Sequence, residues 1–225
     1  MRSLLGACQR GSDLAFAPLV RRAAALLAPA VQTPPHFIYL LLTVEDKRFI
    51  LHGGIDPLAA ARAALHNLTG RGGLQGASTI TQQLYNVTRE EAGLRRSRTM
   101  PAKWRQGLWA LGHQCRHSKR EILAAYLDRV YWGRSYHGLD AAAHGYCGVT
   151  RPALSLAQSF FLVERLATPN LLRPRRIAAL LRRRSIAPLF ARRIGARAEL
   201  LSLYDRHFAA GTRLRRELAS PPTQQ

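Results

Sequence analysis

The sequence predicts a mainly α-helical fold, and three observations support that prediction. No alternating run of apolar and polar residues long enough for a strand occurs in the 225 residues. Apolar residues instead recur at helical spacing in several segments. At the start of three of these segments, serine or threonine stands three residues before glutamine or glutamate, which is the capping-box pattern. These boxes begin at Thr79, Ser118 and Ser155.

The N-terminal part of the chain is expected to form two helices. The first covers residues 13–31, with Asp13 as its cap and apolar residues at helical spacing. The second, Phe37–Glu45, is apolar and places Glu45 and Asp46 at its C-terminal end. Carboxylates at that end oppose the helix dipole and cost stability. Their position therefore indicates that they are kept for chemistry.

The middle of the chain combines helices with a glycine loop. Asp56 and Pro57 form a cap and a first-turn proline, which start a helix running to about Asn67. The loop Gly70–Gly76 follows. The next helix is expected to begin inside the hydroxyl cluster Ser78–Thr81, where its first backbone N–H groups would be free to meet an anion.

Three further helices are expected before the basic C-terminal region. Pro101 starts the first of them, the box at Ser118 starts the second, and the box at Ser155 starts an apolar third that stops before Pro169. The helix that begins at Pro101 has one apolar face, formed by Trp104, Leu108 and Leu111.

From Arg173 onward the composition becomes strongly basic. Thirteen arginines occur up to Arg216, against three acidic residues up to Glu217. Apolar residues still recur at helical spacing, so we expect amphipathic basic helices, the first of them interrupted at Pro188. Their arginines are most simply a solvated or membrane-facing surface.

The charge balance restricts the class of partner. The formal net charge is +21 and the sequence pI is about 11.5. Such a surface attracts a polyanion, which is a nucleic acid, an anionic bilayer or a pyrophosphate-bearing substrate. The three cysteines are odd in number and lack metal-ligand spacing, so neither a disulfide framework nor a zinc site is indicated. They are Cys8, Cys115 and Cys147.

One stretch near the N-terminus has the length of a membrane span. Residues 23–44 carry no Asp, Glu, Lys or Arg. Pro29 and the pair Pro34-Pro35 divide this stretch into pieces that are too short to span a bilayer. We therefore expect neither a transmembrane helix nor a signal peptide within this chain.

Two closely spaced motifs resemble those of a known family. Glu45–Phe49, followed by His52, Gly54 and Asp56, resembles the first motif of the family 51 glycosyltransferases. These are the peptidoglycan polymerases found alone or as one half of bifunctional penicillin-binding proteins. Gly76–Gln83 is similar to their second motif without a gap. Segments similar to the fourth motif and, more loosely, the fifth are Ser118–Ala143 and Leu154–Pro174.

The resemblance implies a lysozyme-like globular lobe with a smaller hydrophobic jaw that contacts the membrane. It divides the chain into three expected parts. Residues 1–34 are an N-terminal helical, membrane-proximal segment, residues 35–180 are the family 51 glycosyltransferase domain, and residues 181–225 are a basic helical C-terminal extension.

The resemblance also implies an activity. The expected enzyme is an inverting hexosyltransferase that polymerises lipid II into glycan strands and releases undecaprenyl pyrophosphate, in peptidoglycan and cell-wall biogenesis. Its expected partners are lipid II, the growing glycan strand, the anionic membrane surface and other cell-wall synthesis proteins, with no nucleic acid. Mg²⁺ or Mn²⁺ bridging the pyrophosphate is the implied cofactor, and no residue is singled out as a metal ligand. The implied location is the periplasmic face of the bacterial inner membrane.

Individual residues take their expected roles from the resemblance. Glu45 matches the general base that takes the proton of the acceptor sugar 4-hydroxyl, and its place after an apolar run suits a raised pKa. Asp46 either positions Glu45 or a metal, or caps local backbone. His52 is more simply a structural residue of the turn before Gly53-Gly54. The expected substrate-binding residues are Ser78, Thr79, Gln82, Gln83, Arg98, Lys103 and Gln106.

The third motif departs from the family pattern Arg-Lys-x-x-Glu. Here Lys103 is kept, while Ala102 replaces the arginine and Gln106 replaces the glutamate. Asn86 stands where the family has a lysine after the second motif. An amide can form hydrogen bonds, but it carries no charge and holds a metal poorly. These substitutions predict an impaired activity.

Two other interpretations stay open at this point. One is a degenerate family member that binds lipid-linked glycan or a cell-wall partner without efficient catalysis, which the third motif favours. The other is a nucleic-acid-binding protein, which rests on charge alone because no recognised binding module or interleaved aromatic residues are present. The hydroxyl cluster at Ser78 and Thr79 also fits helix capping alone.

Overall fold

The computed structural model describes residues 14–69, 76–97 and 99–220. Its fold is mainly α-helical, which confirms the fold class predicted from the sequence. Within the described ranges, the single β-type pairing is an isolated bridge between Tyr131 and His137.

The chain divides into two compact units. Unit 1 is formed by Met1–Lys47 and Tyr131–Gln224, and unit 2 is formed by Arg48–Val130. The two segments of unit 1 therefore come from opposite ends of the chain, and all of unit 2 is inserted between them. The predicted boundaries at residues 34 and 180 do not coincide with this division, and as domain boundaries they stay a prediction.

Unit 1 begins with two helices whose limits are set by prolines. The helix α2 (Ala17–Leu27) is followed by a single 3₁₀ turn, η1 (Pro29–Val31). The helix predicted over residues 13–31 is therefore interrupted near Ala28, because Pro29 has no N–H to continue the α-helical hydrogen bonds. The cap predicted for it, Asp13, lies outside the described residues.

The helix α3 (Pro35–Glu45) is the central helix of unit 1. Every side chain from Phe37 to Thr43 is buried. The helix packs against α2 and against α9 (Leu156–Arg165), in which nine residues are buried. A helix that is apolar all round needs partners on several faces, and these contacts explain why the Phe37–Glu45 pattern lacks an amphipathic period.

Short helices connect the segment around the isolated bridge at Tyr131 to α9. They are α8 (Leu139–Ala142), the π-helical η2 (Ala143–Cys147) and the 3₁₀ turn η3 (Arg151–Ala153). Arg151 stabilises this connection, because its guanidinium donates to both carboxylate oxygens of Asp140 at 2.9 and 2.7 Å and to the Val31 carbonyl at 3.4 Å.

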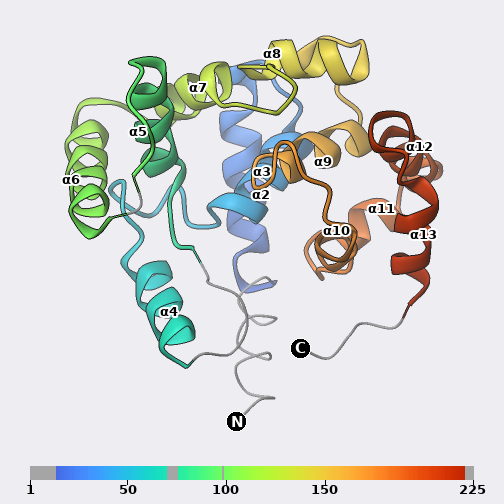
Figure 1. Cartoon of the computed structure of the whole chain (residues 1–225), viewed down its shortest axis with the longest axis horizontal. Helices are drawn as coiled ribbons and strands as arrows, with labels where there is room; N and C mark the ends of the chain where they lie inside the picture. Colours follow the sequence, from blue (N-terminus) through green and yellow to red (C-terminus); the bar gives the residue numbers. More distant parts are fainter. Residues whose placement is uncertain (1–13, 70–75, 98, 221–225) are drawn as a thin grey trace. The chain divides into compact units, whose positions relative to one another are not determined.

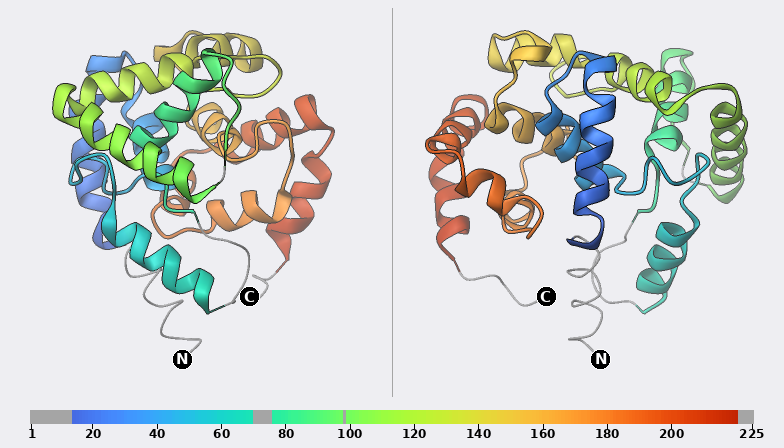
Figure 2. Two further views of the ribbon diagram at one scale, coloured as in Figure 1. Left: turned by 60° about the vertical axis from the view of Figure 1, so that its left-hand side comes forward. Right: turned by 180° about the vertical axis from the view of Figure 1, so that it is seen from behind.

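The basic C-terminal region forms four helices within unit 1, which gather on one side of it (Figure 2). They are α10 (Pro174–Leu181), α11 (Ala187–Ala191), α12 (Ala196–Phe208) and α13 (Gly211–Ala219). Pro188 lies in the first turn of α11, so the predicted interruption of the first basic helix is confirmed. The helix α12 packs against α9, where the fully buried pair Glu164 and Arg165 meets the hydroxyl of Tyr204.

Four helices form within the described residues of unit 2. They are α4 (Pro57–Leu68), α5 (Ile80–Glu91), α6 (Met100–Arg116) and α7 (Lys119–Arg129). The helix α5 packs against both α6 and α7, which lie on either side of it (Figure 1). All three predicted capping boxes form, at the starts of α5, α7 and α9.

Two helices of unit 2 expose several large apolar side chains. On α4, Leu58, Leu65 and Leu68 are exposed, and Leu68 is 85% accessible. The predicted apolar face of α6 forms but is exposed rather than packed, and it carries Met100, Trp104, Leu108 and Leu111. Among the described helices, none combines the length and the apolar content needed to cross a membrane.

Candidate active site

The two adjacent carboxylates stand at the end of the buried helix of unit 1. Glu45 is the last residue of α3, and Asp46 is its C-cap, with its backbone N–H donating to the Leu42 carbonyl at 3.0 Å. Glu45 is half-buried, whereas Asp46 is 6% accessible. The predicted delivery of both residues to a helix C-terminus is confirmed, and their catalytic roles stay a prediction.

The segment after these carboxylates, at the start of unit 2, is held by an ion pair. Arg48 donates to both oxygens of Asp56, from Nε at 2.9 Å and from Nη2 at 2.7 Å. Asp56 also accepts the Ala59 backbone N–H at 2.9 Å as the N-cap of α4. Burial alone would raise the pKa of Asp56, but the Arg48 and Ala59 hydrogen bonds and the Arg48 charge together lower it.

The turn between these residues depends on His52 and Gly54. As predicted, His52 is structural here, because its Nδ1 accepts the Gly54 N–H at 3.2 Å and its carbonyl accepts the Lys119 ammonium at 2.7 Å. Gly54 has a φ of +99°, and a Cβ added to it would lie 2.3 Å from the Ala110 carbonyl oxygen of α6. Glycine is therefore required at this point of the motif.

The second motif is joined to the first through that glycine. Thr79 donates its hydroxyl proton to the Gly54 carbonyl at 2.6 Å and accepts the Gln82 N–H at 3.2 Å. Gln82 completes the capping box by accepting the Thr79 N–H at 3.0 Å. Gln83 accepts the hydroxyl of Tyr126 at 2.8 Å. The capping role predicted for Thr79 is confirmed, while substrate contact by these three residues stays a prediction.

A hydrogen-bonded chain connects α5 and α6. The Lys103 ammonium donates to Ser78 Oγ at 2.7 Å and to Gln106 Oε1 at 2.8 Å. The Gln106 side-chain amide donates to the Gln82 carbonyl at 2.7 Å. Four of the predicted substrate-binding residues, Ser78, Gln82, Lys103 and Gln106, are thereby brought together from two motifs that are distant in sequence.

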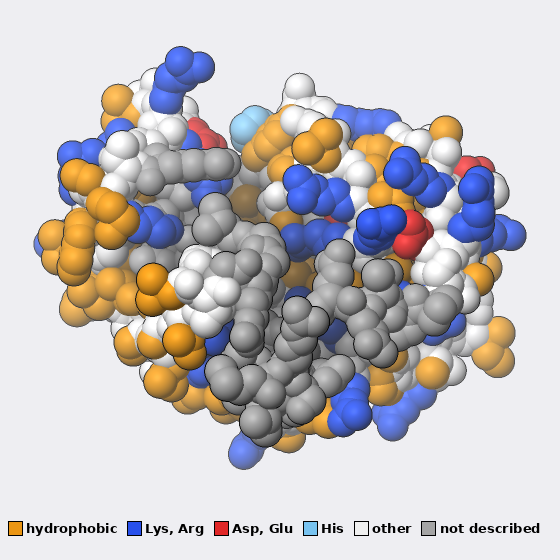
Figure 3. All heavy atoms as spheres, turned by 60° about the horizontal axis from the view of Figure 1, so that its bottom comes forward, with side chains coloured by type: hydrophobic (Ala, Val, Ile, Leu, Met, Phe, Trp, Pro, Cys, Tyr) orange, Lys and Arg blue, Asp and Glu red, His pale blue; other side chains and the backbone are white. Residues whose placement is uncertain are grey.

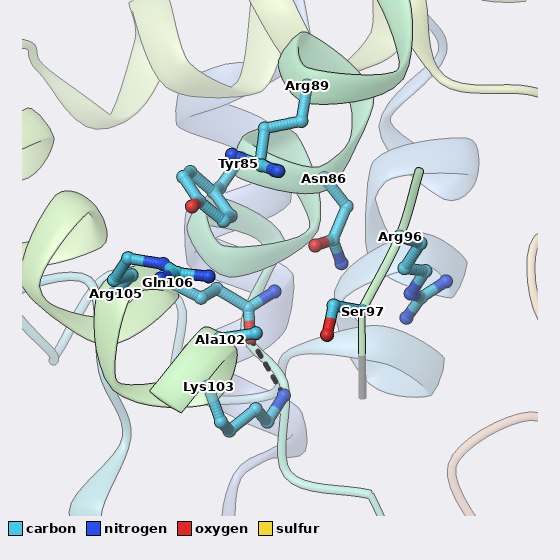
Figure 4. Close-up of a pocket in the computed structure, with 9 residues that line it drawn as sticks. All are labelled: Tyr85, Asn86, Arg89, Arg96, Ser97, Ala102, Lys103, Arg105 and Gln106. Carbon is cyan, nitrogen blue, oxygen red and sulfur yellow. Dashed lines mark hydrogen bonds between the residues drawn. The ribbon is translucent and has the colours of Figure 1, made fainter. Parts of the chain in front are cut away.

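Lys103 and Gln106 also line a pocket of about 130 Å³ in unit 2 (Figure 4). Its remaining walls come from α5, from the segment before α6 and from α6 itself. Cationic side chains dominate the lining, and none of the nine lining residues is acidic. The other seven are Tyr85, Asn86, Arg89, Arg96, Ser97, Ala102 and Arg105.

The electrostatics of the pocket are those of an anion site. Partial burial, followed by the charge of Arg96, lowers the pKa of the Lys103 ammonium. Among the described residues, no Asp or Glu forms an ion pair with any of the four pocket cations, which are Arg89, Arg96, Lys103 and Arg105. A diphosphate group would supply the missing negative charge and accept hydrogen bonds from the N–H groups of these cations.

The pocket does not fit a divalent cation. Mg²⁺ and Mn²⁺ are held in proteins by one or two carboxylates together with substrate phosphates, and this lining offers none. Within the described parts of the chain, no group of three His, Cys, Asp or Glu residues gathers to hold a metal. The implied Mg²⁺ or Mn²⁺ stays a prediction.

Sequence reasoning missed several pocket residues. Arg89, Arg96 and Arg105 were indistinguishable among 34 Lys and Arg residues. A usable signal was the spacing of Tyr85 and Arg89, four residues apart on one face of α5. The predicted contact Arg98 lies outside the described residues.

The helical fold carries a carboxylate pair at the end of a buried helix in unit 1 and a cationic pocket beside a capped hydroxyl motif in unit 2. The family whose model matches residues 16–189 is described as transglycosylase. The match covers more than half of the chain, and the chain belongs to this family.

The chain is similar to several curated relatives. It is 35% identical over 143 residues to penicillin-binding protein 1A of Streptococcus oralis, which is 64% of this chain and 22% of the relative. It is 37% identical over 157 residues to penicillin-binding protein 1B of Vibrio cholerae, which is 68% of this chain and 20% of the relative. It is 35% identical over 143 residues to penicillin-binding protein 1C of Escherichia coli, and this alignment covers 63% of this chain and 18% of the relative. The chain spans about a fifth of the length of these relatives.

Proposed function

We propose that the protein is a peptidoglycan glycosyltransferase that polymerises lipid II into glycan strands and releases undecaprenyl pyrophosphate. The observation that carries the proposal is the network of Lys103, Ser78 and Gln106 beside a pocket lined by cations. A pyrophosphate leaving group needs such a site, because negative charge develops on it as the sugar departs. Membership of the transglycosylase family supports the same class of reaction.

The proposed reaction is a single displacement at the anomeric carbon of the donor sugar. The acceptor 4-hydroxyl oxygen forms a bond to that carbon from the side opposite the pyrophosphate, and the bond from the carbon to the phosphate oxygen breaks. The configuration is therefore inverted. Glu45 takes the proton of the hydroxyl, and the electron pair of the broken bond leaves with the pyrophosphate. Asp46 follows Glu45 in the sequence and is buried, and we propose that it positions that base.

Holding the leaving group is the proposed task of unit 2. Lys103 is already oriented by two hydrogen bonds, so its ammonium is positioned before substrate arrives. Preorganised donors of this kind lose no energy to reorganisation during the reaction. Arg98, by family resemblance, is proposed to contact the same pyrophosphate.

The proposed site of action is a membrane surface. The substrate carries a lipid, and α4 and α6 expose leucines, a methionine and a tryptophan that could enter a bilayer. On the face shown in Figure 3, Lys and Arg side chains are widespread and acidic side chains are few, which suits anionic headgroups. We place the protein at the periplasmic face of the bacterial inner membrane, with the growing glycan strand and other cell-wall synthesis proteins as partners.

The test is glycan synthesis by the purified protein. Supplied with lipid II in detergent and a divalent cation, it should produce glycan chains, and Glu45→Gln should lower the rate at least about a hundredfold. Glu90→Gln, which makes the same change at an exposed position of α5, serves as the matched control and should leave the rate unchanged. Absence of product from the unmodified protein would overturn the proposal.

The degenerate-binder alternative gives a different result in the same assay. It is favoured by Ala102, Asn86 and Gln106, which stand where the family carries charged residues. A protein of that kind would bind lipid II in a pull-down or calorimetric titration and would form no polymer.

A further inference from the structure

We propose that Gln106 is a positioning residue whose neutral amide leaves the charge of Lys103 uncompensated, so that the pocket binds a diphosphate group directly, without a divalent cation. The identification of that group as the pyrophosphate of a lipid-linked sugar rests on the proposed function. The inference explains why an amide occupies this position, which the sequence alone suggests to be a damaged glutamate.

The side-chain amide of Gln106 is held at both of its ends. Gln106 is 3% accessible, and it uses both ends of its side chain. Its oxygen accepts from the Lys103 ammonium at 2.8 Å, and its nitrogen donates to the Gln82 carbonyl at 2.7 Å. Only an amide satisfies both neighbours, because a carboxylate has no proton to donate and would face the carbonyl oxygen with like charge.

The same two contacts fix the orientation of the amide. Turned by 180°, its NH₂ group would face the ammonium and its oxygen would face the Gln82 carbonyl, so that two donors and two acceptors would meet. Gln106 therefore joins Lys103 on its own helix, α6, to the first turn of α5. It sets where the ammonium points without neutralising it.

The charge of the lining supports the same role for Gln106. Lys103 is held by two neutral acceptors, Ser78 Oγ and Gln106 Oε1. Three arginines share the pocket, and none of its described lining residues is acidic. A glutamate at position 106 would pair with Lys103 and cancel part of this field before any ligand arrived. With glutamine, the full positive charge is available to a bound anion.

The lining is also unfavourable to a metal ion. Among the nine described lining residues, a divalent cation would meet four positively charged side chains and no carboxylate. Two lining residues carry a side-chain amide, and the oxygen of one of them, Gln106, already accepts from Lys103, which leaves the neutral amide of Asn86. The chemistry of the lining thus favours cationic side chains as the direct partners of the diphosphate.

The test measures binding of inorganic pyrophosphate to the full chain by calorimetry, in buffer that contains a metal chelator. The unmodified protein should bind, and Lys103→Gln should abolish most of the binding. Gln106→Glu should weaken it about tenfold or more, since it adds a negative charge and loses the bond to Gln82. Gln106→Met, which loses both hydrogen bonds without adding charge, should fall between the unmodified protein and Gln106→Glu.

Gln114→Glu is the matched control. Position 114 lies on the same helix two turns further on, about 12 Å along the axis, so the added charge is mostly screened. This variant should bind pyrophosphate as the unmodified protein does. Circular dichroism melting curves verify that each variant is folded, and Gln106→Met tests the inference even where Gln106→Glu is unstable.

A second readout separates positioning from mere structural support. In Gln106→Glu, the new carboxylate would raise the pKa of Lys103, so the loss of binding at alkaline pH should move to higher pH although affinity is lower. In Gln106→Met, the pH at which binding is lost should not rise. Equal or tighter pyrophosphate binding by Gln106→Glu would overturn the inference. So would binding by the unmodified protein that disappears in chelator and returns with Mn²⁺.

The two proposals can fail separately. Glycan synthesis by the unmodified protein, combined with unweakened pyrophosphate binding by Gln106→Glu, would overturn the role of Gln106 and leave the proposed function standing. If pyrophosphate binding follows the expected pattern but no glycan product forms, the proposed function is overturned and the role of Gln106 stands.

Discussion

The ammonium of Lys103 donates a hydrogen bond to the hydroxyl of Ser78 over 2.7 Å, and this contact joins the third motif to the second. The two residues are 25 positions apart in the chain, on the segment before α5 and on α6. Because Ser78 is held by a cation rather than left in solution, its hydroxyl has a defined place at the edge of the pocket. The contact places Lys103 where the two motifs meet, so a large functional loss should follow its replacement.

Replacing Lys103 is expected to lower the rate of glycan synthesis. Lys103→Gln removes one preorganised charge, which typically costs about a hundredfold to a thousandfold in kcat. The comparison is Arg120→Gln, which removes a charge from an exposed position of α7 and should leave kcat within about twofold. Initial rates across a range of lipid II concentrations give kcat and KM separately. A change confined to KM would contradict a role in stabilising the leaving group.

The rate should also fall at alkaline pH. Burial and the Arg96 charge lower the pKa of Lys103, so its ammonium loses its proton at a pH below that of an ordinary lysine. The activity supported by this charge is present at low and neutral pH and is lost as pH rises through the lowered pKa. Lys103→Arg keeps a charge that does not titrate, and its pH profile should lack this decline. The same decline in both proteins would assign it to another group.

Gly54→Ala is expected to destabilise unit 2. A methyl group there would lie 2.3 Å from the Ala110 carbonyl oxygen, and the φ of +99° is strained for alanine. The free energy of unfolding should fall by about 3 kcal/mol, as expected when a clash and backbone strain combine. Urea denaturation followed by circular dichroism gives the value.

The neighbouring glycine is the control for that substitution. An added Cβ at Gly53 meets no atom within 4 Å, and its φ is not in the left-handed region. Gly53→Ala should therefore stay within about 0.5 kcal/mol of the unmodified protein. Equal losses for the two variants would rule out the close approach of Gly54 to α6 as the cause.

The ion pair of Arg48 and Asp56 should stabilise the fold at neutral pH and lose that effect in acid. The pKa of Asp56 is lowered, so the stabilisation is complete above the ordinary pKa of an aspartate and disappears as pH falls through the lowered value. Asp56→Asn keeps a capping side chain and removes the charge, at an expected cost of about 1–2 kcal/mol at pH 7. The difference between the two proteins should shrink as denaturation is repeated at lower pH.

An exposed ion pair provides the comparison. Arg129 Nη1 lies 3.8 Å from Glu91 Oε2, and both side chains are nearly half accessible. Glu91→Gln should change the free energy of unfolding by less than about 0.5 kcal/mol at any of these pH values. A loss as large as that of Asp56→Asn would show that net charge, rather than the pair, controls stability.

The exposed face of α6 should carry vesicle binding. Leu108→Glu places a charge on that face and should weaken binding to vesicles containing anionic lipid about tenfold, because one inserted leucine contributes about 1.5–3 kcal/mol. Leu171→Glu is the matched control in unit 1, since Leu171 is 60% accessible and Leu108 is 66% accessible. Cosedimentation measures both, and the fluorescence of Trp104 should shift to shorter wavelength on binding. Equal effects of the two substitutions would contradict a membrane contact through α6.

Local patterns in the sequence were sufficient for most of the helical framework. The capping boxes at Thr79, Ser118 and Ser155 start helices where predicted, because the bonds that make a box connect residues only three positions apart. The interruption at Pro188 and the apolar helix ending at Glu45 are likewise consequences of local composition. The prediction of one continuous helix over residues 13–31 was wrong. Pro29 interrupts the α-helix although apolar residues keep their helical spacing on either side of it.

Residue type and short spacing were enough to predict the helices, the carboxylate pair and the resemblance to the family. The contacts of Gln106, in contrast, depend on how the chain folds. Its amide meets Lys103 three residues away and the Gln82 carbonyl 24 residues away, and no spacing rule predicts the second contact. The charge of the pocket also depends on folding. Four of the 34 Lys and Arg residues come together in it where α5 packs against α6. Burial and distance set the energy of a charge, and both are properties of the folded chain.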